Sequence, residues 1–222
     1  MTECKRSVDG YNRLSSFYRL LEFVAFGRAL DRARVSLLSQ LPELDSLLSL
    51  GDGDGRFLSK FLEEQPNCRV TSIDQSSAMI RLQRRRIPKS VADALVDFQI
   101  ADVGEVCFER GRFNAVSVLF FLDCFKEKEL TCLLERVIPW VAPGGFVYFV
   151  DFVLPTSGWQ RIRARFYVRV MHLFFRWCTG LENNRLVDIA RCLEKLELTL
   201  TEERISNFGL IRTAIYRVNE SS

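Results

Sequence analysis

Histidine and paired cysteines are scarce in this 222-residue sequence. It contains one histidine, His172, and none of its seven cysteines has CxxC spacing. Zinc sites are built mainly from cysteine and histidine ligands, often in such pairs. We therefore expect no metal site, and we interpret most of the cysteines as reduced, small apolar side chains of a cytosolic protein.

Long hydrophobic segments are absent as well. The longest apolar stretches, Val116–Leu122 and Phe146–Val150, are far shorter than the roughly 20 residues that a membrane-spanning helix needs. No apolar segment follows the basic residues near the start, so we expect no secretory signal and a cytoplasmic location. The formal net charge is only +3, and we expect no nucleic-acid partner.

From residue 45 onwards, short apolar runs alternate with helical patterns. We predict strands at 47–50, 69–73, 96–101, 113–122 and 146–151, with helices at 56–64, 76–86 and 126–140. Such alternation forms right-handed βαβ units and a parallel sheet. Two last strands, 197–205 and 210–218, have a short connection and must be antiparallel. The prediction is an α/β, three-layer fold whose seven-stranded, mostly parallel sheet ends in an antiparallel hairpin.

Helical segments are predicted on either side of this alternation. Apolar residues recur at helical spacing over 11–40, and helices are predicted at 159–178 and 186–195, before the hairpin. We predict a single domain of 222 residues. Its parts are N-terminal cap helices at 1–42, a core at 45–152, a helical insert at 153–196 and the terminal hairpin at 197–218.

Three glycines at a spacing of two, Gly51, Gly53 and Gly55, separate the first strand from the helix that follows it. Glycine permits positive φ and lets a ligand approach the backbone closely. The free N–H groups at the start of the helix would face that ligand. In open α/β sheets this turn lies at the carboxyl edge, where ligands bind. A tight structural turn is the alternative for the loop taken alone.

An acidic residue, Asp74, follows Gly55 by nineteen positions, at the end of the second predicted strand. A carboxylate there can accept hydrogen bonds from both ribose hydroxyls of an adenosine ligand. The alternative is a helix N-cap or a turn residue. A dinucleotide site is disfavoured, because the loop spacing is GxGxG rather than GxGxxG and little chain remains for a substrate domain.

In this order, the motifs resemble those of class I S-adenosylmethionine-dependent methyltransferases of the small-molecule type. The glycine loop and Asp74 are similar to motif I and the acidic position that follows it. Segments similar to later motifs are 74–79, 99–103, 113–116 and 141–146. The resemblance covers about residues 45–152 well and the hairpin loosely. It implies a Rossmann-like fold that binds S-adenosyl-L-methionine.

The resemblance also implies which residues bind the cofactor. The glycine loop and Asp74 would hold it, and Asp102 with its neighbours would flank the adenine. The cofactor-binding residues implied in this way are Gly51, Asp52, Gly53, Gly55, Asp74, Gln75, Met79, Asp102 and Val103.

Four positions depart from the family pattern. Ser49 stands where the family usually has an acid, and Asn114 replaces a frequent aspartate. Asp52 and Asp54 occupy positions that are more often Cys, Ala, Thr or Ser. We hypothesise that Asp52 compensates for the acid missing at Ser49 by facing the amino group of the cofactor. The departures also motivate a rival hypothesis, a binding protein that keeps the fold without turnover.

No motif marks the methyl-acceptor side, because the protein mainly has to position the acceptor and the cofactor for an in-line displacement. Asp123, after the fourth strand, is a candidate base or orienting group, or else a helix cap. Asp151, at the end of the fifth strand, is a weaker candidate. His172 is a candidate general base or an ordinary helical histidine. Tyr18 either supplies a hydroxyl group to the site or packs.

The predicted helix 159–178 has an aromatic side and a basic stripe. The stripe consists of Arg161, Arg165, Arg169, His172 and Arg176. It is either a solvated face, a contact with a membrane surface, or a contact with an anionic substrate group or a dimer partner. The aromatic insert and the cap helices together would enclose an apolar acceptor. We therefore predict methyl transfer to a small lipophilic or aromatic metabolite, with an RNA or protein methyltransferase as the alternative.

Overall fold

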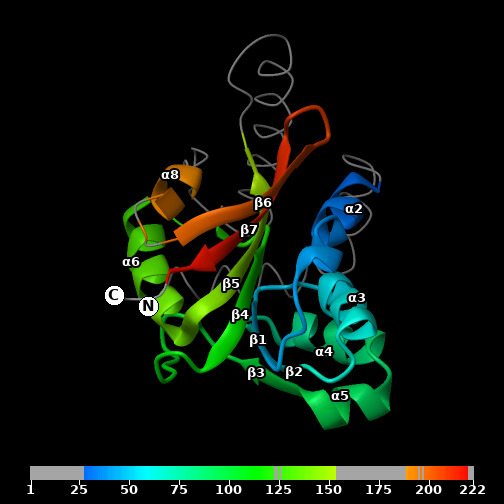
Figure 1. Ribbon diagram of the computed structural model, residues 1–222. Helices are drawn as coiled ribbons and strands as arrows, with labels where there is room; N and C mark the ends of the chain where they lie inside the picture. The colour runs from blue at the N-terminus through cyan, green and yellow to red at the C-terminus, as the bar shows by residue number, and fades with distance from the viewer. Residues whose placement is uncertain are drawn as a thin grey trace, which may run out of the picture.

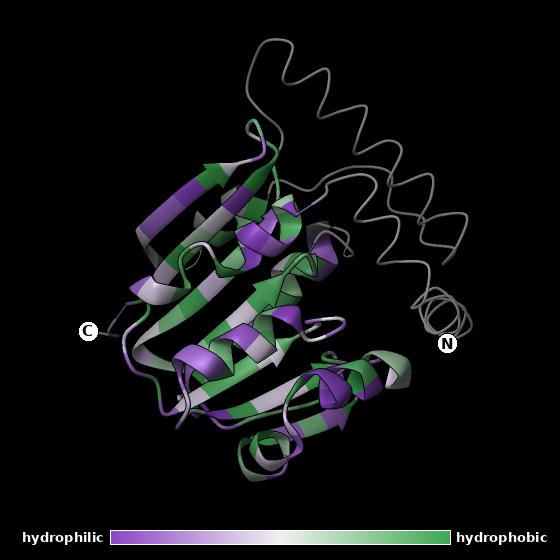
Figure 2. Ribbon diagram, turned by 90° about the vertical axis from the view of Figure 1, so that its right-hand side faces the viewer, coloured by the Kyte–Doolittle hydropathy of each residue, from purple (hydrophilic) through white to green (hydrophobic). Residues whose placement is uncertain are grey.

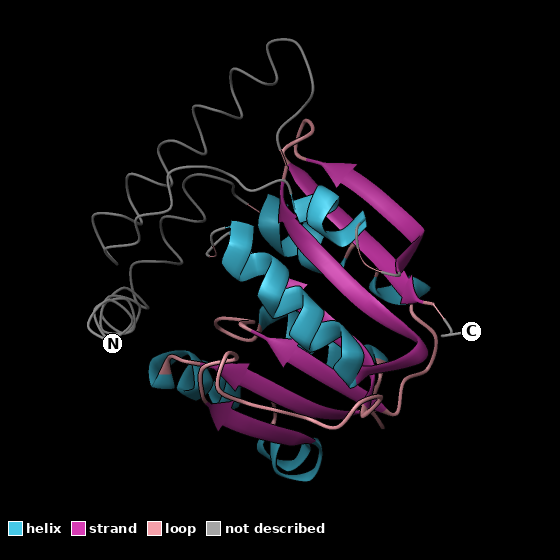
Figure 3. Ribbon diagram, turned by 90° about the vertical axis from the view of Figure 1, so that its left-hand side faces the viewer, coloured by secondary structure: helices cyan, strands magenta, loops and turns pink. Residues whose placement is uncertain are grey.

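The computed structural model describes residues 28–122, 125, 127–153, 189–194, 196 and 198–219. Helices cover both faces of a seven-stranded sheet in this part of the chain (Figures 1 and 3). The strands are β1 Ser46–Leu50, β2 Arg69–Asp74, β3 Val96–Ile100, β4 Phe113–Leu119, β5 Val141–Phe152, β6 Leu198–Ser206 and β7 Ile211–Val218. The helices are α2 Ala29–Val35, α3 Arg56–Glu64, α4 Ser77–Arg86, α5 Lys89–Leu95, α6 Glu127–Val137 and α8 Ile189–Glu194, with 3-10 turns η1 Leu38–Gln40 and η3 Ile138–Trp140.

The strand order is β3-β2-β1-β4-β5-β7-β6. Strands β1 to β5 run parallel, β7 is antiparallel to β5, and β6 is antiparallel to β7. This arrangement confirms the predicted mostly parallel sheet with a C-terminal hairpin. The order changes direction between β1 and β4, so the crevice of the fold lies beyond the carboxyl ends of these two strands.

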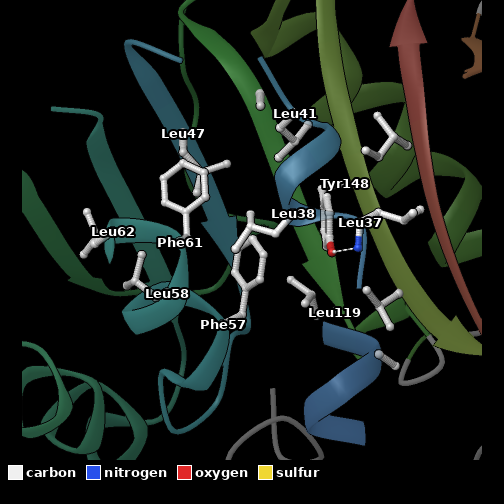
Figure 4. Close-up of a cluster of buried hydrophobic side chains, with 14 of the residues drawn as sticks. Leu37, Leu38, Leu41, Leu47, Phe57, Leu58, Phe61, Leu62, Leu119 and Tyr148 are labelled. Carbon is white, nitrogen blue, oxygen red and sulfur yellow. Dashed lines mark hydrogen bonds between the residues drawn. The ribbon is translucent and has the colours of Figure 1, made fainter. Parts of the chain in front are cut away.

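One hydrophobic cluster lies between the sheet and the layer formed by α2, η1 and α3 (Figure 4). Phe57 of α3 stacks on Tyr148 of β5, with 5.2 Å between the ring centroids. The Tyr148 hydroxyl donates to the backbone oxygen of Arg34 at 2.9 Å and accepts from the backbone N–H of Leu37 at 3.4 Å. These two hydrogen bonds fix the end of α2 over the middle of the sheet.

A second cluster fills the opposite face, where α6, η3 and α8 pack on the sheet. Leu130 and Leu193 are fully buried there, and Phe108 contacts the Trp140 ring edge-on with centroids 5.2 Å apart. Hydrophobic residues are accordingly concentrated along the central strands (Figure 2). The two clusters hold the strand ends, and hence the crevice, in a fixed arrangement.

Two predicted strand boundaries are wrong. β4 ends at Leu119 rather than at residue 122, because Phe120 has a φ of +51° and turns the chain out of the sheet. β5 begins at Val141 rather than at residue 146. Val141 pairs with Phe113, and an irregularity between Phe113 and Ala115 absorbs the expected turn around Gly144, whose φ is +75°.

Helix α5 is absent from the sequence-based prediction. It begins directly after Pro88 and has only seven residues, about two turns, so it is too short to show a helical periodicity in the sequence. The predicted helix 11–40 is described only from residue 28, where it is divided into α2 and η1. The predicted helix 159–178 lies outside the described residues, and so do Tyr18, Asp123 and His172.

Candidate functional site

The ends of three parallel strands are joined by backbone hydrogen bonds at the carboxyl edge of the sheet. Gly51 donates to the backbone oxygen of Ile73 at 2.9 Å, which links the ends of β1 and β2. Ala101 donates to the backbone oxygen of Asp74 at 3.2 Å, which links β2 to β3. The structure therefore brings the glycine loop, Asp74 and the segment at Asp102 to one edge, as the sequence predicts.

The three loop glycines all have left-handed backbone conformations, with φ of +61° at Gly51, +65° at Gly53 and +80° at Gly55. A Cβ atom on Gly51 would lie 2.4 Å from the Phe121 ring, and one on Gly55 would lie 3.0 Å from the Cα of Gln83. A Cβ atom on Gly53 would meet nothing within 4 Å. Gly53 therefore leaves room that a ligand can use, whereas the other two glycines also satisfy the packing of the loop.

Asp74 holds the glycine loop against the end of β2. Its carboxylate accepts from the backbone N–H of Ser76 at 2.8 Å and from the backbone N–H of Gly53. Burial raises its pKa to about 6, and these two hydrogen bonds oppose the rise. The N-cap of α4 is Ser76, whose Oγ accepts from Met79 N at 3.2 Å. A carboxylate has about four acceptor positions, so Asp74 can still accept ribose hydroxyls.

Asp52 lies between two of the loop glycines, and its side chain is only 5% exposed. Its Oδ2 accepts from the backbone N–H of Leu58 at 3.1 Å and so caps the first turn of α3. Its Oδ1 has no hydrogen-bond partner among the described residues. Burial raises the pKa of Asp52 to about 7. The Leu58 hydrogen bond and the charge of Arg34 oppose this rise, whereas Asp54 and Asp74 add to it.

Asp54, the second acidic residue that departs from the family pattern, anchors the loop to the neighbouring helices. Its Oδ1 lies 2.8 Å from Arg56 Nε and its Oδ2 lies 2.8 Å from Arg86 NH2. Arg86 Nε also donates to the backbone oxygen of Asp54 at 2.8 Å. The carboxylate thus fixes the outside of the loop to α3 and α4, away from the open side at Gly53.

Gln83 is a site residue that the sequence analysis missed. Its side chain is fully buried on α4, accepts from Ser72 Oγ at 2.7 Å and donates to the backbone oxygen of Gly53 at 3.0 Å. It therefore links β2, α4 and the glycine loop. No local motif marks it, because its partners are 11 and 30 residues away in the sequence.

Ser49 and Asn114, the two other positions that depart from the family pattern, have different surroundings in the structure. Ser49 is fully buried, and its hydroxyl has no hydrogen-bond partner among the described residues. Asn114 Oδ1 accepts from the backbone N–H groups of Asp45 and Ser46, at 3.1 and 3.0 Å. Asn114 thus holds the start of β1, at the opposite edge of the sheet from the glycine loop.

The other residues implied by the resemblance lie around the same edge. Gln75 is half-buried between β2 and α4, and Met79 is buried in the first turn of α4. Asp102 Oδ1 accepts from Gly104 N at 2.8 Å and forms a turn after β3, with Val103 buried beside it. Their contact with a cofactor stays a prediction.

Phenylalanine rings gather where β4 and β5 end. Phe120 packs on Phe152 with centroids 5.0 Å apart, and Phe121 contacts Phe125 edge-on at 5.1 Å. Asp151 precedes Phe152 and is fully buried, with its Oδ1 accepting from Phe152 N. Of the acceptor-side candidates, only Asp151 falls among the described residues. The rings make this part of the edge apolar.

A basic cavity of about 420 Å³ lies beside the outer side of the loop. It is lined by Arg28, Asp31, Arg32, Arg34, Val35, Arg56, Ser59, Lys60 and Arg86. Among the described residues of this lining, Asp31 is the only acidic one and six are arginine or lysine, so these residues give the cavity a positive potential. Among the described helices, none has the length and hydrophobicity needed to cross a membrane.

Comparisons with known proteins agree with this geometry. Residues 47–145 match the family model described as a methyltransferase domain. No curated protein sequence matches significantly. The methyltransferase in the Haloferax volcanii complex with the Trm112 methyltransferase activator has a TM-score of 0.74 at 12% identity, with 97% of this chain and 99% of that chain covered.

Two further solved structures share the fold. Burkholderia thailandensis 1,6-didemethyltoxoflavin-N1-methyltransferase, solved with bound 1,6-didemethyltoxoflavin and S-adenosylhomocysteine, has a TM-score of 0.64 at 18% identity, with 96% of this chain and 88% of that chain covered. TnmH has a TM-score of 0.64 at 15% identity, with 93% of this chain covered, and this chain spans only 60% of its length. Residues 47–145 thus match a methyltransferase domain, and the sheet order, with the glycine loop and Asp74 at its carboxyl edge, is that of the Rossmann-like fold that these solved structures share.

Proposed function

We propose that this protein is an S-adenosylmethionine-dependent methyltransferase and that it modifies a small lipophilic or aromatic metabolite in the cytoplasm. The phenylalanine rings beside the glycine loop are the observation that carries the proposal. Phe121 lies against Gly51, and Phe120 packs on Phe152 across the ends of β4 and β5. Such rings desolvate and orient an apolar acceptor, whereas a charged macromolecular surface gains little from them.

The residues of the carboxyl edge have the chemistry to hold the cofactor. The Gly51–Gly55 loop offers a close approach to the backbone, Asp74 accepts the ribose hydroxyls, and Asp102 lies on the adenine side. Gln75, Met79 and Val103 would line the same region. When bound, the cofactor supplies a sulfonium-activated methyl group for in-line displacement by the acceptor. The phenylalanines exclude water from that reaction and position the acceptor.

The acceptor proton needs a group near the ends of β4 and β5 only if the acceptor is protonated at neutral pH. Asp123, His172 and Tyr18 are our candidates for holding or removing that proton. A contact of helix 159–178 with a membrane surface also stays a prediction, and it would suit a lipophilic acceptor.

Methyl transfer from labelled S-adenosylmethionine to a cell extract tests this proposal. After the reaction, label is counted separately in solvent-extractable small molecules, in RNA and in protein. We expect it in the small-molecule fraction, and a Gly53→Val variant should transfer none. Label confined to RNA or protein would contradict the proposed acceptor class. If the wild-type protein binds the cofactor but transfers no label, the non-catalytic alternative is favoured.

A further inference from the structure

The cavity beside α2, α3 and the end of α4 is basic, and the proposed cofactor site does not include it. Its described lining contains none of the loop residues 51–55, and Asp74 is not part of it either. We propose that this cavity binds a phosphate group, carried either by a small metabolite or by a lipid headgroup. The inference concerns a second ligand and goes beyond the proposed methyl transfer.

Three guanidinium groups form the inner wall of the cavity, and two carboxylates hold them in place. Arg56 bridges Asp31 and Asp54, at 2.6 and 2.8 Å. Arg34 lies 3.3 Å from Asp31, and Arg86 lies 2.8 Å from Asp54. The side chains of Arg34, Arg56 and Arg86 are only 7%, 18% and 28% exposed. Among the described residues, two carboxylates thus fix three cations without balancing their charge.

Three further cations of the lining are exposed and form the rim of the cavity. They are Arg28 at the N-cap of α2, Arg32 on α2 and Lys60 on α3. Neither Arg28 nor Arg32 forms an ion pair with a described residue. Lys60 pairs with Glu63 at 2.6 Å, but both side chains are 58% exposed, and such a pair contributes little. The rim therefore keeps a positive charge that attracts an anion.

A phosphate group matches this arrangement of cations better than a carboxylate does. A phosphate monoester carries up to two negative charges and three acceptor oxygens, so several guanidinium groups can bind it at once. Ser59, which also lines the cavity, adds a hydroxyl donor. The volume of about 420 Å³ is in the range of sites for small organic ligands. The phosphate would therefore carry an organic group rather than bind as the bare ion.

Asp54 separates the cavity from the open side of the glycine loop. Its carboxylate binds Arg56 and Arg86, which line the cavity. The space beside Gly53, where the cofactor is proposed to approach the loop, is not bounded by these side chains, since a Cβ atom there would meet nothing within 4 Å. A phosphate-bearing ligand and the cofactor should therefore bind at the same time.

Calorimetry at constant ionic strength tests the inference with inorganic phosphate and glycerol 3-phosphate, with and without saturating S-adenosylhomocysteine. Sedimentation with vesicles of phosphatidylcholine, alone or mixed with phosphatidic acid, tests the lipid headgroup. The test variant combines Arg28→Gln with Arg32→Gln, at two exposed positions of the rim. The control variant combines Arg85→Gln with Arg110→Gln, which removes the same charge from exposed arginines outside the described lining.

We expect the test variant to bind the soluble probes roughly 10- to 100-fold more weakly, and the control variant to stay within about threefold of the wild type. Saturating S-adenosylhomocysteine should change phosphate binding by less than about threefold. Binding of glycerol 3-phosphate without vesicle binding would support a metabolite as the source of the phosphate. Binding to phosphatidic acid vesicles that only the test variant loses would support a lipid headgroup.

Three results would overturn the inference. They are the absence of binding by every probe, equal losses in the test and control variants, and displacement of phosphate by S-adenosylhomocysteine. The last result would assign the cations to the cofactor site. All three leave the proposed function intact, because methyl transfer to the extract is measured without these probes.

Discussion

At the scale of single residues, the three glycines of the loop differ in role, because two of them are needed for packing and one for ligand binding. Gly51 is confined by the Phe121 ring and Gly55 by the backbone and side chain of Gln83, but Gly53 faces open space. Gly53→Ala should therefore cost only the left-handed strain, about 1 kcal/mol of unfolding free energy, and should still abolish measurable cofactor binding by calorimetry. Gly111→Ala is the control, because Gly111 has a similar φ of +69° and an ordinary Cβ contact at 3.7 Å. Equal binding by the two variants would refute a ligand site at Gly53.

Gln83 gives a second prediction at this scale. Gln83→Met removes the hydrogen bonds to Ser72 and Gly53 while keeping a similar side-chain volume. Because buried polar groups lose their partners, we expect the free energy of unfolding to fall by about 1–3 kcal/mol and the cofactor affinity to fall as well. Urea denaturation and calorimetry measure the two effects. The exposed Gln40, changed to Met, should alter neither.

The candidate site could be predicted from the sequence only where one local segment determines it. The three glycines and Asp74 carry their own signal, because backbone conformation and position at a strand end follow from local sequence. Gln83 and Arg34 do not, since each acts through partners that only the folded chain brings near. For Asp54 the sequence shows that the residue type is unusual for the family, but it does not show the ion pairs with Arg56 and Arg86.

At the scale of elements, the N-terminus of α4 connects the sheet edge to the site. Ser76 Oγ accepts from Met79 N, and Ser76 N donates to Asp74. Ser76→Ala removes only the first of these bonds, so we expect a loss of about 1 kcal/mol in unfolding free energy. Thermal and urea denaturation measure it. Ser90→Ala, at an exposed position of α5, is the control and should be neutral or slightly stabilising. An equal effect at both positions would contradict the capping role.

The predicted bounds of helices and strands were wrong where tertiary contacts outweigh the local sequence pattern. The apolar run from Phe113 to Leu122 has no local signal that ends a strand at Leu119, yet the left-handed conformation of Phe120 ends it there. Val141 joins β5 because it pairs with Phe113, although Pro143 and Gly144 favour a turn. Helix α5 has only seven residues, which is too short a segment for a helical period to be recognised. Strands β1 and β4 were predictable because they are almost entirely buried and mostly apolar.

At the scale of the whole molecule, two buried carboxyl groups should make stability fall as the pH rises. The pKa is raised from 3.8 to about 7 for Asp52 and to about 6 for Asp74, mainly by burial. Well below pH 3.8 both groups are protonated in the folded and unfolded states, so neither contributes to the pH dependence. Between pH 4 and 7 the folded state retains protons that the unfolded state has lost, so these groups lower the unfolding free energy as the pH increases. Above pH 7 the loss is complete.

Asp52→Asn isolates one of these contributions. The variant should lose less stability than the wild type between pH 4 and 7, with a slope that differs by at most about 1.4 kcal/mol per pH unit. Urea denaturation at a series of pH values measures the slopes, and Asp97→Asn is the control with an exposed carboxyl group. Parallel curves for Asp52→Asn and the wild type would show that Asp52 titrates normally.

The same linkage predicts that cofactor binding releases a proton. If a ligand ammonium group lies beside Asp52, its charge lowers the raised pKa of that carboxyl, and a proton bound near pH 6 leaves when the complex forms. Calorimetry in buffers of different ionisation enthalpy should report release approaching about one proton per S-adenosylhomocysteine bound. Asp74 releases a proton only where the ribose hydroxyls bind beside it. The ligand 5′-methylthioadenosine carries the ribose but lacks the amino-acid group, so it measures the proton release from Asp74 alone. The difference between the two ligands should vanish in Asp52→Asn, because an amide has no proton to lose. If the difference persists in the variant, the proton comes from another group. The charge of Asp52 then takes no part in binding the amino-acid group.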